Sequence, residues 1–253
     1  MRILRDRSVP LLVLAAVAAV LAHPTVATAF LGFVGGPPRE PVGASRLAVL
    51  ARDHAIVALL GLLPALGLGI GLGIAVTRPG LKPLRPVTDG LSALAQATPP
   101  VVVVALAFPV LGFGVAPTVL ALAIYAIMPV YRASAAAFET LPPAILEAAR
   151  ALGMTPRQIL IEIELPLARP LLADAFRIAV LLGIATAAVG ALAGAQTLGT
   201  PIVTGLQTQN EVTIFQGAAA TAALAFAADG LALVAFARRR DRPQTSPLAG
   251  SAA

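Results

Sequence analysis

The chain has 253 residues, of which 58% are hydrophobic and only 12% are charged, and its formal net charge is +6. A soluble domain carries about 25% charged residues, so this composition excludes an ordinary soluble protein and predicts a single membrane domain. Cysteine is absent, which excludes disulfides and thiolate metal sites, and the two histidines, His23 and His54, are far apart. We therefore expect no metal, no cofactor and no catalytic residue in this chain.

Six apolar stretches are long enough to cross a bilayer, which requires about 20 residues of helix. They lack the alternation of hydrophobic and polar residues that is typical of barrel strands. The sequence therefore predicts an all-α, polytopic membrane protein with six transmembrane helices, at residues 9–31, 55–76, 90–111, 116–138, 170–193 and 212–236.

Prolines and glycines interrupt several of these stretches. We expect neighbouring helices to repair the backbone groups that the prolines leave unpaired, as membrane helices tolerate such kinks. In the second stretch Gly67, Gly69, Gly71 and Gly73 alternate, so that two pairs lie four residues apart. This spacing favours close helix packing rather than nucleotide binding, because a dinucleotide fingerprint needs a different spacing and a strand–turn–helix context.

The basic residues predict the orientation. If the N-terminus is cytoplasmic, 14 Lys and Arg residues lie on the inner side and three, Arg39, Arg46 and Arg52, lie on the outer side. Such a bias places both termini and the 139–169 loop in the cytoplasm. Because 17 of the 18 basic residues are Arg beside apolar segments, we interpret them as topology signals and expect no nucleic-acid partner.

The chain divides into three predicted regions. Residues 1–46 hold the first helix and an outer loop, 47–237 form the core, and 238–253 form a basic, disordered tail. The first stretch has a rival interpretation, because Ala27-Thr28-Ala29 resembles a signal-peptidase site. We favour an uncleaved anchor, since this apolar stretch is long for a signal peptide.

A charged helix–turn–helix lies between the fourth and fifth spans. Leu141-Pro142-Pro143 can open a short helix, and Gly153 stands where a left-handed residue would end it. Thr155 and Gln158 then have the spacing of a capping box around Pro156, and we expect the second helix to end at Leu165-Pro166. Small Ala148 and Ala149 would let a partner approach closely.

The spacing of this loop resembles the EAA loop of ABC-importer permeases, the segment that docks into the ATPase subunit. The residues that carry the resemblance are Glu147, Ala148, Ala149, Gly153, Ile163, Leu165 and Pro166. Further stretches resemble permeases for osmoprotectants such as glycine betaine, choline and carnitine, among them 96–100, 124–132, 164–168, 176–179 and 198–206. The chain departs from that family at Gln196-Thr197, where the family has Gly-Gly, and at Pro100 and Ala133-Ser134.

The resemblance implies a type I permease core with an extra N-terminal helix, in an inner membrane. It also implies a second permease subunit, identical or different, two ATPase subunits and an extracytoplasmic solute-binding protein. The chain has no G-x-x-x-x-G-K-[ST] motif, so ATP hydrolysis is expected in a separate subunit. Two alternatives stay open: a permease of this fold for an amino acid or a thiol-betaine, and a membrane scaffold or receptor that transports nothing.

Three charges lie within or beside apolar stretches: Asp174, Arg177 and Asp229. Charges inside a membrane are functional candidates. However, Asp174 and Arg177 are three residues apart and can pair on one helix face, and Asp229 lies near the Arg-rich end of the last span. We therefore favour structural or interfacial roles over a transport-path role for all three.

Overall fold

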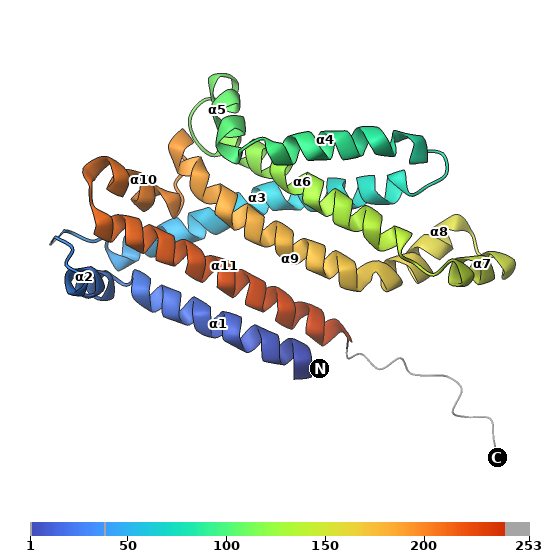
Figure 1. Cartoon of the computed structure of the whole chain (residues 1–253), viewed down its shortest axis with the longest axis horizontal. Helices are drawn as coiled ribbons and strands as arrows, with labels where there is room; N and C mark the ends of the chain where they lie inside the picture. Colours follow the sequence, from blue (N-terminus) through green and yellow to red (C-terminus); the bar gives the residue numbers. More distant parts are fainter. Residues whose placement is uncertain (1, 38, 241–253) are drawn as a thin grey trace, which may run out of the picture.

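The computed structural model describes residues 2–37 and 39–240, which form an elongated bundle of helices (Figure 1). Gly114 and Gly194 form an isolated β-bridge between two loops. The α-helices are α1 Arg2–Ala22, α2 Pro24–Phe33, α3 Ala44–Val76, α4 Arg85–Ala97, α5 Pro100–Leu111, α6 Val115–Glu139, α7 Pro143–Ala151, α8 Pro156–Gln158, α9 Leu165–Val189, α10 Gly199–Thr208 and α11 Glu211–Arg240. Two 3₁₀ segments, η1 Lys82–Leu84 and η3 Gly190–Ala193, and one π-helix, η2 Ile159–Glu164, complete them.

Four of the six predicted spans are continuous helices, within Ala44–Val76, Val115–Glu139, Pro156–Ala193 and Glu211–Phe236. The other two predictions, 9–31 and 90–111, are wrong as single helices. Each is a pair of helices bent by 81° at α1–α2 and by 92° at α4–α5. The described part of the chain thus has four to six candidate spans, the higher number holding if each bent pair is counted as one. Residues 238–240 of the predicted tail form the end of α11 and are helical, and residues 241–253 lie outside the described residues.

Both bends occur where a residue precedes proline. His23, before Pro24, has an extended backbone with ψ 136°, and Thr98 and Pro99, before Pro99 and Pro100, have ψ 119° and 138°. A proline ring clashes with a helical conformation of the preceding residue, so the chain leaves the helix at that point. Single prolines at 64, 109 and 129 are accommodated inside α3, α5 and α6.

The centre of the bundle is the contact between α3 and α6. Small buried residues of α3 recur every four positions, at Gly61, Ala65, Gly69 and Gly73. A Cβ atom added at Gly69 would lie 2.7 Å from a Val130 methyl group, so the close approach requires glycine. The predicted packing role is confirmed for Gly69 and Gly73, whereas Gly67 and Gly71 face open space.

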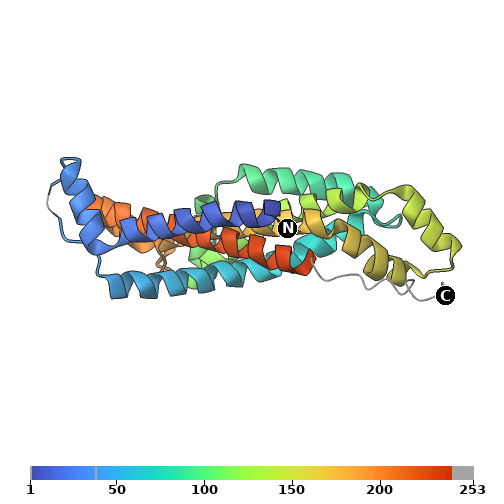
Figure 2. The same cartoon turned by 90° about the horizontal axis from the view of Figure 1, so that it is seen from below.

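The bundle has two distinct ends. We call the end with α7, α8 and η2 the hairpin end, and the end with α2 and α10 the far end (Figure 1). Figure 2 shows α2 lying across the long axis at the far end, and the hairpin projecting at the other end. Helix α1 runs beside α11 in both views, and a Cβ atom added at Gly230 of α11 would lie 2.9 Å from Leu12.

Candidate coupling hairpin and its supports

The turn of the hairpin is fixed by Gly153. Its φ is +77°, a left-handed conformation that glycine adopts without strain. The Gly153 N–H donates to the Arg150 carbonyl at 2.9 Å, and the Met154 N–H donates to the Ala149 carbonyl at 3.1 Å. These two bonds form a Schellman motif, which satisfies carbonyls that the end of α7 would otherwise leave unpaired. The predicted left-handed cap at Gly153 is confirmed.

The second arm of the hairpin starts with the predicted capping box. Thr155 Oγ1 accepts the Gln158 N–H at 3.3 Å, and Gln158 Oε1 accepts the Thr155 N–H at 2.9 Å. Pro156 follows the cap at the first helical position, where a missing N–H has no consequence. The hairpin therefore holds its shape through hydrogen bonds between residues no more than five apart.

The prediction that this arm ends at Leu165-Pro166 is wrong. The arm passes through the π-helix η2 into α9, giving 38 residues of nearly continuous helix from Pro156 to Ala193. Leu165 keeps helical dihedrals and its N–H donates to the Leu160 carbonyl, five residues back. Pro166 lies in the first turn of α9, where proline is tolerated. The second arm of the hairpin is thus continuous with a membrane helix.

The residues of the predicted docking motif divide into an exposed and a buried group. Glu147, Ala148 and Gly153 are exposed, and the neighbouring Leu152 is 83% exposed. Ala149 is only 4% exposed, and its carbonyl accepts the Met154 N–H across the turn. Of the two alanines expected to admit a partner, Ala148 is therefore accessible and Ala149 supports the turn.

The other motif residues lie at the base of the hairpin. Leu165 packs against a buried cluster of Ala137, Phe138, Leu141 and Ala168. Ile163 is half-buried and Pro166 is exposed. The apolar base fixes the hairpin to α6 and α9, while the polar tip stands away from the bundle.

An ion pair that the sequence analysis missed ties the hairpin to α3. Arg78, just after α3, donates two hydrogen bonds to Glu164, at 3.0 Å from Nη1 to Oε1 and 2.5 Å from Nη2 to Oε2. Glu164 is only 5% exposed, and the guanidinium also lies 5.9 Å from the centre of the Phe138 ring. A sequence pattern gives no signal for a pair 86 residues apart.

The three charges in the apolar stretches also form a cluster. Arg177 of α9 forms two hydrogen bonds to Asp229 of α11, at 2.6 and 2.9 Å. Asp174, the partner expected from the sequence, lies 3.6 Å from Arg177, but its side chain is 71% exposed. The pairing of Asp174 with Arg177 is confirmed, whereas the stronger bond to the buried Asp229 joins two helices and was not foreseen.

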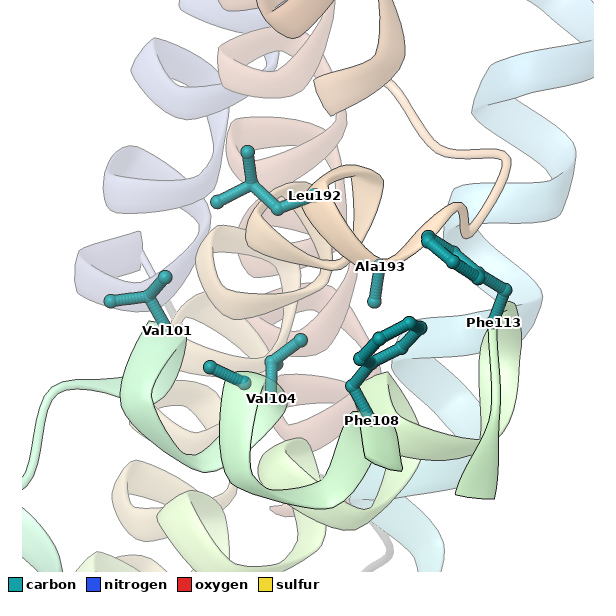
Figure 3. A pocket seen from close by; sticks show the side chains of 7 residues that line it. Val101, Val104, Phe108, Phe113, Leu192 and Ala193 are labelled. Atoms are coloured by element: carbon teal, nitrogen blue, oxygen red, sulfur yellow. The ribbon is translucent and has the colours of Figure 1, made fainter. Parts of the chain in front are cut away.

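An apolar cavity of about 220 Å³ lies between α5 and η3 (Figure 3). Phe108 and Phe113 meet edge to face at one side, with ring centres 4.3 Å apart, and Leu192 and Ala193 face them. The lining is hydrophobic, and the described residues include no cluster of three potential metal ligands anywhere in the fold.

The sequence of this chain is similar to those of a known protein family and of several transport permeases. Residues 65–242 match the family described as "Binding-protein-dependent transport system inner membrane component". An osmoprotectant import permease protein of Salmonella typhimurium, OsmY, is 33% identical over 79% of this chain and 84% of its own length. The glycine betaine/carnitine/choline transport system permease protein OpuCD of Bacillus subtilis is 32% identical over 70% of this chain and 76% of its own length.

Solved structures agree on the fold. The methionine ABC transporter in an inward-facing conformation superposes with a TM-score of 0.67 at 22% identity, covering 78% of this chain and 95% of that one. An amino acid ABC transporter gives a TM-score of 0.61 at 20% identity, over 77% of this chain and 94% of that one. The family match covers more than half of the chain and includes the hairpin, so the protein belongs to the binding-protein-dependent transport system inner membrane components.

Proposed function

We propose that this chain is the permease subunit of an ATP-driven importer for an osmoprotectant-like solute such as glycine betaine, choline or carnitine. The supporting observation is that relatives named for these solutes match along most of the chain, hairpin included. The mechanism is alternating access, in which closure of an ATPase dimer moves the hairpin and thereby tilts α9. The partners are two ATPase subunits, a second permease subunit and an extracytoplasmic binding protein.

A second solute class is supported by one relative. The ergothioneine transport permease/ergothioneine binding protein EgtU of Helicobacter pylori is 33% identical over 52% of this chain and 24% of its own length. Ergothioneine is a betaine that carries sulfur, so the same quaternary ammonium chemistry would be recognised. An amino acid is the remaining alternative, since solved structures of that class share the fold.

Reconstitution tests the transport proposal. The permease, its ATPase and its binding protein are placed in liposomes, and uptake of labelled glycine betaine, choline, carnitine, ergothioneine and methionine is measured with and without ATP. We expect ATP-dependent uptake of at least one quaternary amine. Uptake of methionine alone would refute the osmoprotectant assignment, and ATP-dependent uptake of none, by a complex that assembles, would favour a scaffold.

The docking role belongs to the exposed tip of the hairpin, with Glu147 and Ala148 facing the ATPase and Gly153 fixing the turn. Gly153→Val forces a β-branched residue to φ +77°, at a local cost of roughly 1–3 kcal/mol. We expect normal insertion but at least tenfold less ATPase association, measured by co-purification. Gly153→Asn should retain most association, because Asn tolerates the left-handed region. Gly71→Val, at an exposed helical position, is the control.

The proposed orientation places the hairpin end and both termini in the cytoplasm, as the bias of basic residues indicates. Because the native chain has no cysteine, single cysteines report this without background. Gln158 at the hairpin and Gln207 at the far end are both exposed. In intact cells, a membrane-impermeant thiol reagent should label Gln207→Cys and spare Gln158→Cys. The reverse pattern would invert the topology.

A further inference from the structure

His54 is a fully buried polar residue inside the membrane-spanning helix α3, and the function proposed above does not use it. Its Nε2 lies 2.9 Å from the Ile184 carbonyl of α9, and its Nδ1 lies 3.1 Å from the backbone nitrogen of Leu198. A carbonyl can only accept and an N–H can only donate, so the ring is neutral and carries its proton on Nε2. Both ring nitrogens are therefore bonded to backbone groups of other elements.

The two hydrogen-bond partners of His54 belong to two different helices, α9 and α10. Ile184 lies on α9, which continues without a loop from the hairpin. Leu198 is the N-cap of α10, the short helix at the far end, so His54 satisfies an amide that the start of α10 would otherwise leave unpaired. Thr197 Oγ1 accepts the next amide, from Gly199, at 3.2 Å. His54 thus acts as a capping group supplied from 144 residues away.

Helices α9 and α10 are in direct backbone contact at this point. A Cβ atom added at Gly199 would collide with the Ala188 carbonyl of α9. Thr197 and Leu198 are both fully buried. A displacement of the outer half of α9 must therefore either carry His54 and the start of α10 with it or break the hydrogen bond between His54 and Ile184.

We propose that His54 is a positioning residue that couples the movement of α9 to α10, in addition to the direct contact between Ala188 and Gly199. Because the 21 residues from Glu164 to Ile184 are helical, this connection extends about 30 Å, from the base of the hairpin to the far end. In an importer, this helical connection would join the side of the membrane where the ATPase binds to the side where a solute-binding protein docks. The inference rests on the proposed function, and its physical basis is the shared contact of three elements rather than proximity alone.

The test uses the complete complex of permease, ATPase and binding protein in liposomes. His54→Leu fills a similar volume but removes both hydrogen bonds, whereas His54→Gln keeps one donor and one acceptor. His23→Leu is the matched control, because His23 is exposed and its side chain contacts only the neighbouring Thr25 hydroxyl among the described hydrogen bonds. ATP hydrolysis is measured alone and with solute-loaded binding protein, together with assembly.

We expect His54→Leu to assemble and to keep basal ATP hydrolysis within twofold of the native complex. Its stimulation by loaded binding protein should fall at least fivefold, while His54→Gln and His23→Leu keep most of theirs. Full stimulation in His54→Leu, or an equal loss of basal and stimulated hydrolysis, would overturn the inference. If His54→Leu does not assemble, His54→Asn, whose shorter amide cannot reach both partners, is judged by the same criteria.

A second readout follows α10 directly. A cysteine at the exposed Gln207 is labelled with and without a non-hydrolysable ATP analogue. The labelling rate should respond to the analogue in the native background and should lose at least half of that response in His54→Leu. An unchanged response contradicts the role of His54. Because neither readout requires quaternary amine uptake, failure of the solute assignment would show separately, as a wild-type complex that imports another solute.

Discussion

The two ends of the bundle are held together by different kinds of contact. At the hairpin end, Gly153, Thr155 and Gln158 form their hydrogen bonds within five residues of chain. At the far end, His54 and Gln216 bond to backbone groups 130 to 194 residues away. A local fold can form by itself and be presented to a partner, whereas the far end exists only when distant helices meet. Substitutions should therefore change the shape of the hairpin at one end and the connection between helices at the other.

The largest effect is expected where the hairpin depends on a distant residue. Glu164→Ala removes the buried acceptor of two hydrogen bonds from the partly exposed Arg78, which should destabilise the permease by about 2–3 kcal/mol. The measurement is the temperature at which the purified complex loses its monodisperse state. Asp53→Ala is the control, because Asp53 pairs with its exposed neighbour Arg52 and such pairs contribute about 0–1 kcal/mol. Equal melting of the two variants would show that the hairpin is self-sufficient.

The next effect tests the far end. Gln216 is fully buried and bonds to the Ala22 carbonyl and to both backbone groups of Val42, at 2.8 to 3.1 Å. Gln216→Ala leaves these groups unpaired, at a cost of about 2 kcal/mol. Hydrogen exchange of the Val42 amide should then quicken at least tenfold, while the hairpin amides keep their rates. Gln207→Ala, at an exposed position, should change neither. If the hydrogen-exchange rates of the hairpin amides rose as much as that of the Val42 amide, the two ends would not be stabilised independently.

The smallest effect concerns the local cap. Thr155→Ala removes the acceptor of the Gln158 N–H and should cost about 1 kcal/mol. Exchange should quicken at Gln158 alone, by about fivefold, and the Val42 amide should be unaffected. Thr155→Ser keeps the hydroxyl group and should behave like the native chain. A change that spreads to Val42 would mean that the hairpin and the far end unfold together.

The distance along the chain between contacting residues explains which features could be predicted from the sequence. The positive φ of Gly153 and the capping box at Thr155 are encoded within a few residues, and four of the six spans by a continuous apolar stretch, and the structure confirms these features. The bend at Pro99-Pro100 had a visible signal, but the length of the apolar stretch concealed it. The pairs of Arg78 with Glu164 and of Arg177 with Asp229 had none, because partners 86 and 52 residues apart are chosen by helix packing.

The π-helix between the hairpin and α9 has a consequence for helical phase. Its backbone bonds reach back five residues rather than four, so it holds more residues per turn than the α-helix around it. Removing one residue from 159–164 would allow ordinary α-helical bonding throughout. Because a turn with five-residue bonds holds about one residue more than an α-helical turn, this deletion would leave the tip of the hairpin, with Ala148, facing nearly the same direction around the axis of α9. The π-helix thus takes up one extra residue without changing the direction in which the hairpin faces.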